Sequence, residues 1–167
     1  MRRFVVFFTA LCFFGVAALA PSAFGQSLTV RDDPNDSRAE IDIRRVYSDL
    51  AAHDVTLRIR SWERFGRHAV GTFNLRFNLD TQGDNERDFV LYIGGSSRRP
   101  LCSLVDVTVG VSVGDRRAHR PDSRDISCTL PRGWFDITKT VGFSVKYLDP
   151  NGRAQDLAPN ERRYRGL

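Results

Sequence analysis

The residues whose types and spacing best suit chemistry are aspartates and asparagines gathered in three short segments of the chain. A hard cation such as calcium takes several oxygen ligands at once, so closely spaced carboxylate and amide side chains are what its site requires. These residues therefore indicate where a calcium ion is to be sought. The three groups are Asp32, Asp33, Asn35 and Asp36; Asp80, Gln82, Asp84, Glu86 and Asp88; and Asp149, Asn151 and Asp156.

The middle group does not match the EF-hand calcium loop. Such a loop needs glycine at its sixth position and a bidentate glutamate at its twelfth, where this chain has Asn85 and Leu91. The alternative is a solvated hairpin turn whose Asp and Asn side chains accept hydrogen bonds from their own backbone. Alternating apolar residues on both sides of the group favour the hairpin.

The first and last groups each contain Asp-Pro-Asn and lie near the two ends of the chain. In many antiparallel sandwiches the first and last strands are close together, so the two groups would be able to share one ion. We therefore predict a structural calcium site that joins the ends of the domain. Its predicted ligands are Asp33, Asn35, Asp36, Asp149 and Asp156.

Signatures of catalysis are missing from the sequence. It contains no G-x-S-x-G, H-E-x-x-H, P-loop or G-x-G-x-x-G motif. Its three histidines, His53, His68 and His119, are far apart and fall in polar connecting segments. We expect no enzyme; the alternative that stays open is a small secreted hydrolase with two carboxylates facing a sugar cleft.

The first 25 residues have the three-part pattern of a secretory signal peptide. Arg2 and Arg3 precede an apolar run over residues 4–20, and Ala23-Phe24-Gly25 supplies small residues before a cut. We predict cleavage after Gly25, a single domain over residues 26–167 and a secreted, extracellular location. The alternative is a retained membrane anchor, because the apolar run approaches the length of a span.

The mature chain would carry 23 basic and 20 acidic residues, which gives a net charge of +3. This mild excess gives no argument for nucleic acid as a partner, and we expect a monomer that has no membrane contact after cleavage.

Cys102 and Cys128 are the two cysteines left after processing. In an oxidising compartment they are expected to form one disulfide, the alternative being two buried thiols.

Apolar residues recur with period two from Ile41 onward, which is typical of strands that are buried on one face. The runs are separated by Gly-Asp, Gly-Gly and Asp-Pro-Asn-Gly turn signals. We predict an all-β protein, an antiparallel β-sandwich of jelly-roll type with seven to nine strands. Its ends, residues 26–31 and 161–167, are expected to be loose.

The order of four motifs resembles the DOMON-like and family 9 carbohydrate-binding-module-like group of secreted β-sandwich domains. These motifs are DPND before EIDI, FNLDTQGDNERDFVLYI, SRDISCTLPRGWF and YLDPNGRAQDLAPN. The resemblance implies a jelly-roll sandwich, often with bound calcium, that binds sugar or haem. The family's N-terminal turn contains a glycine that Asp33, Asn35 and Asp36 lack, and the mature chain has no methionine to ligate haem.

Aromatic side chains are the usual platforms for sugar rings, and Trp62, Tyr92 and Trp134 are the candidates here. The alternative is that Trp134 belongs to the core and that Trp62 covers a sheet edge. A basic loop over residues 114–125, with Arg98 and Arg99 near it, suits an anionic polymer. Its interspersed acids favour a solvated hairpin tip instead.

These patterns together predict a secreted, non-catalytic binding module for carbohydrate or cell-envelope polymer, stabilised by calcium. Its partner would be an extracellular polysaccharide. The alternative is a protein-interaction or inhibitory domain that has no sugar site and binds a secreted protein.

Overall fold

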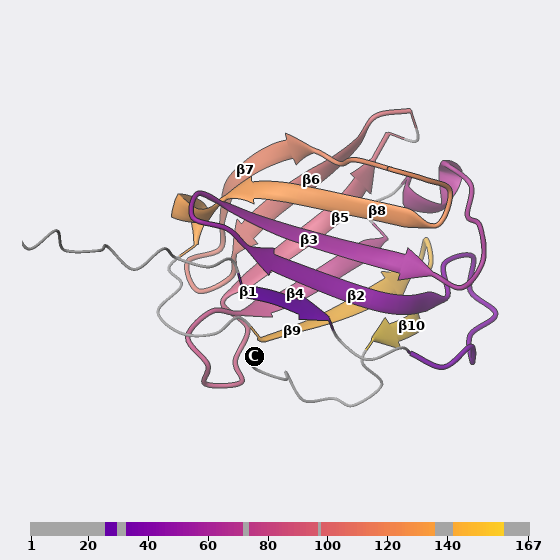
Figure 1. The fold of residues 1–167 in the computed structure, drawn as a ribbon, viewed down its shortest axis with the longest axis horizontal. Helices are drawn as coiled ribbons and strands as arrows, with labels where there is room; N and C mark the ends of the chain where they lie inside the picture. Colours follow the sequence, from indigo (N-terminus) through magenta and orange to yellow (C-terminus); the bar gives the residue numbers. More distant parts are fainter. Residues whose placement is uncertain (1–25, 30–32, 72–73, 97, 136–141, 159–167) are drawn as a thin grey trace, which may run out of the picture.

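The computed structural model describes residues 26–29, 33–71, 74–96, 98–135 and 142–158 of the chain (Figure 1). The predicted signal peptide, residues 1–25, lies outside this part. Ten strands and two short 3-10 helices make up the fold. In chain order they are β1 (Gln26–Thr29), β2 (Ile43–Leu50), β3 (Asp54–Ser61), η1 (His68–Val70), β4 (Leu75–Asp80), β5 (Phe89–Gly95), β6 (Pro100–Asp106), β7 (Val111–Arg117), β8 (Asp125–Pro131), η2 (Arg132–Trp134), β9 (Gly142–Leu148) and β10 (Ala154–Ala158).

The strands form two antiparallel sheets that lie face to face, which confirms the predicted antiparallel β-sandwich (Figure 1). The smaller sheet has the order β1-β2-β3-β8, and the larger has the order β10-β9-β4-β5-β6-β7. Nine of these ten strands begin at or after Ile43, and the sequence predicts seven to nine. Among the described residues, no helix has the length and apolar character that a membrane span requires.

The predicted loose start of the mature chain is wrong for residues 26–29. This segment is strand β1, which pairs with β2 from Gln26 opposite Leu50 to Thr29 opposite Tyr47. A strand of four residues is too short to show a period-two pattern, so its partner rather than its own sequence decides its conformation.

The core fills the space between the inner faces of the two sheets. In β3, for example, Val55, Leu57 and Ile59 are buried while the residues between them are more exposed. Phe77 of β4 and Phe143 of β9 are the bulkiest fully buried side chains. The alternation of apolar and polar residues is therefore the property that places each strand between core and solvent.

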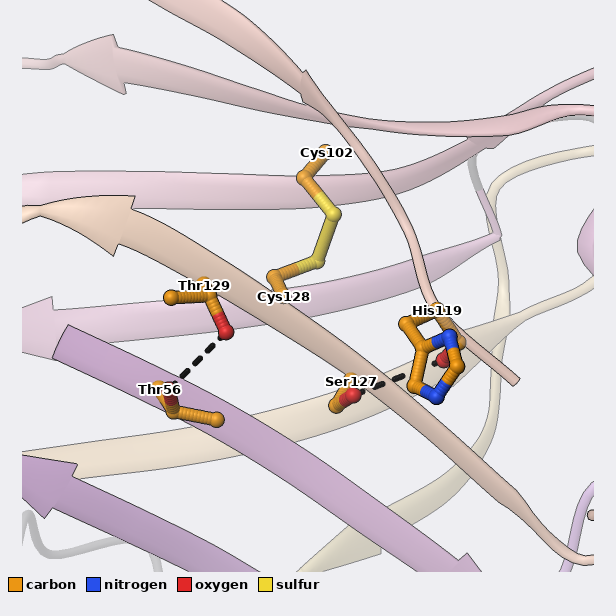
Figure 2. Close-up of a disulfide and its surroundings, with 6 residues drawn as sticks. All are labelled: Thr56, Cys102, His119, Ser127, Cys128 and Thr129. Atoms are coloured by element: carbon orange, nitrogen blue, oxygen red, sulfur yellow. Dashed lines mark hydrogen bonds between the residues drawn. A yellow bond between two sulfur atoms is a disulfide. The ribbon is translucent and has the colours of Figure 1, made fainter. Parts of the chain in front are cut away.

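A disulfide joins the two sheets, as the cysteine count predicts. Figure 2 shows Cys102 of β6 bonded to Cys128 of β8, with their Cα atoms 6.0 Å apart. A cross-link that closes a loop of 26 residues should stabilise the folded chain by about 3 kcal/mol. Nearby, the hydroxyl groups of Thr56 and Thr129 share a hydrogen bond of 2.9 Å on the outer face of β3 and β8.

Candidate metal centre

Three carboxylates from opposite ends of the chain meet in the folded protein. Asp33, Asp36 and Asp156 each offer one oxygen, and these atoms all lie within 4.8 Å of one another. Calcium binds oxygen at 2.3–2.6 Å, so two ligands of one ion lie at most about 5 Å apart. The spacing therefore fits one calcium ion.

The position of Asp156 is set by strand β10 at the edge of the larger sheet. A register shift between Ala154 and Asp156 interrupts the pairing of β10 with β9, and such irregularities re-aim side chains. The Asp156 carboxylate accepts hydrogen bonds from the backbone N–H of Ile43 at 2.5 Å and of Leu157 at 2.9 Å. The side chain is 6 % exposed, and its bond to Ile43 ties β10 to the start of β2.

The segment 33–42 carries the other acids and is held against both sheets. The backbone N–H of Asp33 donates to the carbonyl of Arg44 at 2.8 Å, and Asp33 is 3 % exposed. The Ser37 hydroxyl donates to the carbonyl of Gln155 at 3.0 Å. Asp36, between these anchors, is exposed. Two of the three converging carboxylates are thus buried, and the third faces solvent.

Asp42 is a fourth acid beside this group, and the sequence patterns did not predict it. It lies between the fully buried Ile41 and Ile43 and is 6 % exposed. Its Oδ1 atom is buried and has no hydrogen-bond partner among the described residues. Burial, then the charges of Asp156 and Asp36, raise the pKa of Asp42 to about 6.

Asp156 also has a raised pKa. Burial raises the pKa of its carboxyl above the ordinary value, and the charge of Asp36 adds to this. The hydrogen bonds from Ile43 and Leu157 act in the opposite direction, because they favour the ionised form. A divalent cation among these carboxylates would lower both raised pKa values, since opposite charge stabilises the anion.

One predicted ligand, Asp149, is not among the three converging carboxylates. Asp149 accepts hydrogen bonds from the backbone N–H of Asn151 at 2.9 Å and of Arg153 at 2.8 Å, and so closes the β9–β10 turn. Asn35 lies between Asp33 and Asp36 in the chain and is exposed, and its role as a ligand stays a prediction. We name Asp33, Asp36, Asp42 and Asp156 the terminal carboxylates from here on.

The acidic hairpin between β4 and β5 has a different arrangement. Asp88 accepts hydrogen bonds from the N–H of Thr81 at 2.6 Å, the Thr81 hydroxyl at 2.9 Å and the N–H of Gln82 at 3.2 Å. Asp80 accepts from the N–H of Gly83 at 2.5 Å and of Asn85 at 2.8 Å. Asp80 and Asp88 therefore accept hydrogen bonds from the turn that contains them, as the hairpin interpretation of this sequence expects.

The three candidate aromatic residues do not form one platform. Trp62 follows the end of β3, while Trp134 lies in η2 beyond Pro131, which pairs with Asp54 at the other end of β3. That strand length corresponds to roughly 25 Å. Tyr92 lies in the middle of β5, opposite Arg76 of β4, on the outer face of the larger sheet.

Each of the three rings is half-buried and has an arginine guanidinium over it. The guanidinium carbons of Arg44, Arg76 and Arg116 lie 4.7, 5.6 and 4.6 Å from the ring centroids of Trp62, Tyr92 and Trp134, respectively. Trp62 is also hydrogen-bonded to the backbone of two residues that carry terminal carboxylates. Its indole Nε1–H donates to the Asp33 carbonyl at 2.9 Å, and its backbone N–H donates to the Asp42 carbonyl at 2.9 Å.

Comparison of this chain with protein-family models, with curated proteins and with solved structures finds no match. The resemblance to DOMON-like and family 9 carbohydrate-binding-module-like domains therefore stays a prediction.

Proposed function

We propose that this protein is a non-catalytic binding module of the extracellular space whose terminal carboxylates hold one calcium ion. The observation that carries the proposal is the convergence of Asp33, Asp36 and Asp156 within 4.8 Å, with Asp42 buried beside them. Burial and the neighbouring acids raise the pKa values of Asp42 and Asp156, so ionising these two groups costs stability unless a cation compensates it. Calcium is the metal of choice, because all of the side-chain ligands are oxygens.

The ion would join parts of the fold that are far apart in the sequence. Asp33 and Asp36 belong to the segment before β2, whereas Asp156 belongs to the last described strand. A ligand that binds only the native state raises the free energy of unfolding. The ion would thus do at the chain ends what the disulfide does between the sheets.

We propose a carbohydrate or cell-envelope polymer as the ligand of the module. Trp62 supports this choice, because its hydrogen bonds to the backbones of Asp33 and Asp42 hold an aromatic ring beside the terminal carboxylates. An aromatic side chain fixed in this way offers an apolar surface to a sugar ring at little cost in conformational entropy. Calcium, by ordering segment 33–42, would hold Trp62 in place.

Retention of the mature protein on insoluble polysaccharides and on purified cell envelopes tests this function. We expect retention of the wild type in calcium, weaker retention in EGTA, and a loss of at least tenfold for Trp62→Ala. Tyr92→Ala, on the outer face of the larger sheet, is the aromatic control and should bind as the wild type does. If no polymer retains the wild type, and a pull-down from culture supernatant captures a protein instead, the binding-module proposal is overturned in favour of a protein-interaction domain.

A further inference from the structure

A basic pocket lies where three connections of the sandwich meet. Its volume is about 370 Å³, and it is lined by five basic side chains together with Pro100 and Ala118. None of the described residues that line it is acidic. The five basic side chains, which we call the arginine pocket, are Arg67, Arg98, Arg117, His119 and Arg120.

The fold brings these residues together from distant parts of the sequence. Arg67 precedes η1, Arg98 lies between β5 and β6, and Arg117 ends β7. The backbones of His119 and Ser127 exchange two hydrogen bonds of 2.8 Å, which fix the connection from β7 to β8. Figure 2 shows the hydrogen bond that the Ser127 hydroxyl adds to the His119 carbonyl. The N–H of Ala118 donates to the Pro100 carbonyl at 2.9 Å. The pocket is therefore built on paired backbone rather than on a free loop.

Arg120 is the most constrained member of the pocket. Its Nη2 donates to the carbonyl of Phe65 at 2.9 Å, and its guanidinium lies 4.4 Å from the Phe65 ring centroid. Its Nε is buried and has no acceptor among the described residues. Burial, and then the charge of Arg67, lower the pKa of Arg120. A bound anion would relieve both effects.

Acids of the same loop form ion pairs or hydrogen bonds with neighbouring residues. Asp125 pairs with Arg60 at 3.0 Å. Asp122 accepts hydrogen bonds from the backbone N–H of Arg124 at 2.6 Å and of Asp125 at 2.9 Å. Neither acid lines the arginine pocket itself, although Asp122 lines the neighbouring hollow and its charge partly offsets the lowering of the Arg120 pKa.

We propose that the arginine pocket binds a phosphate or sulfate ester carried by an extracellular polysaccharide. Guanidinium groups offer paired donors that match the oxygens of such esters, and four of them can satisfy one tetrahedral group from several sides. A second hollow shares Arg67 and Arg120 with the first and is completed by Phe65, Gly66, Asp122 and Ser123. A polymer that carries the ester therefore has room to continue from the arginine pocket into the second hollow, whereas a free ion would occupy the arginine pocket alone.

This inference rests on the proposed polymer-binding function but not on the calcium site. It gives the ligand of that function an anionic character. Segment 62–65 contacts both regions, because the Trp62 N–H donates to the Asp42 carbonyl and the Phe65 carbonyl accepts a hydrogen bond from Arg120 Nη2 at 2.9 Å. The arginine pocket and the terminal carboxylates thus contact the same stretch of chain.

The test measures binding of the mature protein to dextran sulfate, phosphorylated dextran, unmodified dextran and single-stranded DNA in one buffer with 0.15 M salt. The variant Arg98→Ala/Arg117→Ala removes two exposed pocket arginines. The control Arg87→Ala/Arg153→Ala removes the same charge from exposed positions in the β4–β5 and β9–β10 connections. A third variant, Arg98→Lys/Arg117→Lys, keeps the charge and removes the paired donors.

We expect the wild type to bind both charged dextrans, with at least a thirtyfold loss for the alanine pocket variant and less than a threefold loss for the control. The lysine variant should lose about fivefold, because lysine acts as a point charge without the arginine fork. An equal loss in the pocket variant and the control would overturn the pocket, since net charge alone would explain it. Unmodified dextran bound equally by wild type and pocket variant, without preference for the esters, would overturn this inference and leave the proposed function standing. Tighter binding to DNA than to the charged dextrans would overturn the ligand class.

Discussion

The acidic hairpin and the terminal carboxylates are built from the same residue types but solve the burial of charge in different ways. Asp80 and Asp88 are buried and accept hydrogen bonds from the N–H groups of their own turn. Asp42 and Asp156 are buried next to acids of other segments, and their pKa values are raised even though Asp156 accepts two backbone N–H bonds. A dense acidic segment therefore becomes a structural turn where backbone donors are at hand. It becomes a candidate cation site where carboxylates from separate segments face one another.

The largest effect that separates the two regions is expected at Asp88. Asp88→Ala removes the acceptor for the Thr81 N–H, the Thr81 hydroxyl and the Gln82 N–H. Hydrogen bonds to charged groups contribute about 1.5–3 kcal/mol each and are not additive, so we expect a loss of about 4 kcal/mol in the free energy of unfolding. Urea unfolding in EGTA and in calcium measures it. The same loss should appear in both, whereas a loss seen only in calcium would make the hairpin a metal site.

The pH dependence of the calcium-free protein should reveal Asp42. Its pKa is about 6 in the folded state against 3.8 for an ordinary Asp, so its stabilising contribution is complete below pH 3.8. That contribution is lost as the pH rises to 6, by up to about 3 kcal/mol. The charges that face Asp42 are those of Asp156, Asp36 and Glu63.

The comparison of wild type with Asp42→Asn, by urea unfolding between pH 4 and pH 7 in EGTA, isolates this contribution from that of other acids. The wild type should lose stability relative to the variant as the pH rises. A constant difference would mean that neither burial nor the neighbouring acids raise the pKa of Asp42.

Thermal melting should respond to calcium through the terminal carboxylates. At a calcium concentration of a hundred times Kd, binding adds about 2.7 kcal/mol, which for a domain of this size raises Tm by about 8 °C. Asp156→Asn should abolish the increase, while Asp149→Asn, in the β9–β10 turn, should keep it. Equal Tm values of the wild type in EGTA and in excess calcium would remove the calcium ion from the account.

The smallest effect on stability is expected at Asp36, which is exposed and yet one of the three converging carboxylates. Asp36→Asn should change the calcium-free stability by less than about 0.5 kcal/mol, as surface substitutions do. Its calcium affinity should fall about tenfold, because one charged ligand is lost. The matched control is Asp84→Asn, an exposed acid of the hairpin. If both variants bind calcium equally, Asp36 is not a ligand.

Much of the fold could be predicted from the sequence, because burial on one face of a strand leaves a period of two that no other element produces. The sandwich and the Cys102–Cys128 disulfide follow from that period and from the cysteine count. Strand β1 could not be predicted, since it depends on its pairing with β2. The local sequence pattern predicts a strand wherever one face of that strand is buried. It does not predict a strand that forms only because it pairs with a neighbour.

The candidate sites show the same division. Asp33, Asp36 and Asp156 could be named because Asp-Pro-Asn segments mark both ends of the chain. Asp42 was missed, since an acid between Ile41 and Ile43 reads as the solvent face of a strand. The structure buries it next to Asp156 and Asp36, whose charges act on its carboxyl. The arginine pocket was only partly visible, because nothing in the sequence places Arg67 beside the loop 114–125.

Isothermal titration of calcium into the mature protein, freed of metal with EGTA and then desalted, tests directly whether the terminal carboxylates bind the ion. We expect one calcium ion per chain for the wild type and none for Asp33→Asn/Asp156→Asn. We also expect an unchanged stoichiometry of one for Asp80→Asn in the hairpin. No binding by the wild type, or binding that the terminal substitutions leave intact, would contradict this expectation.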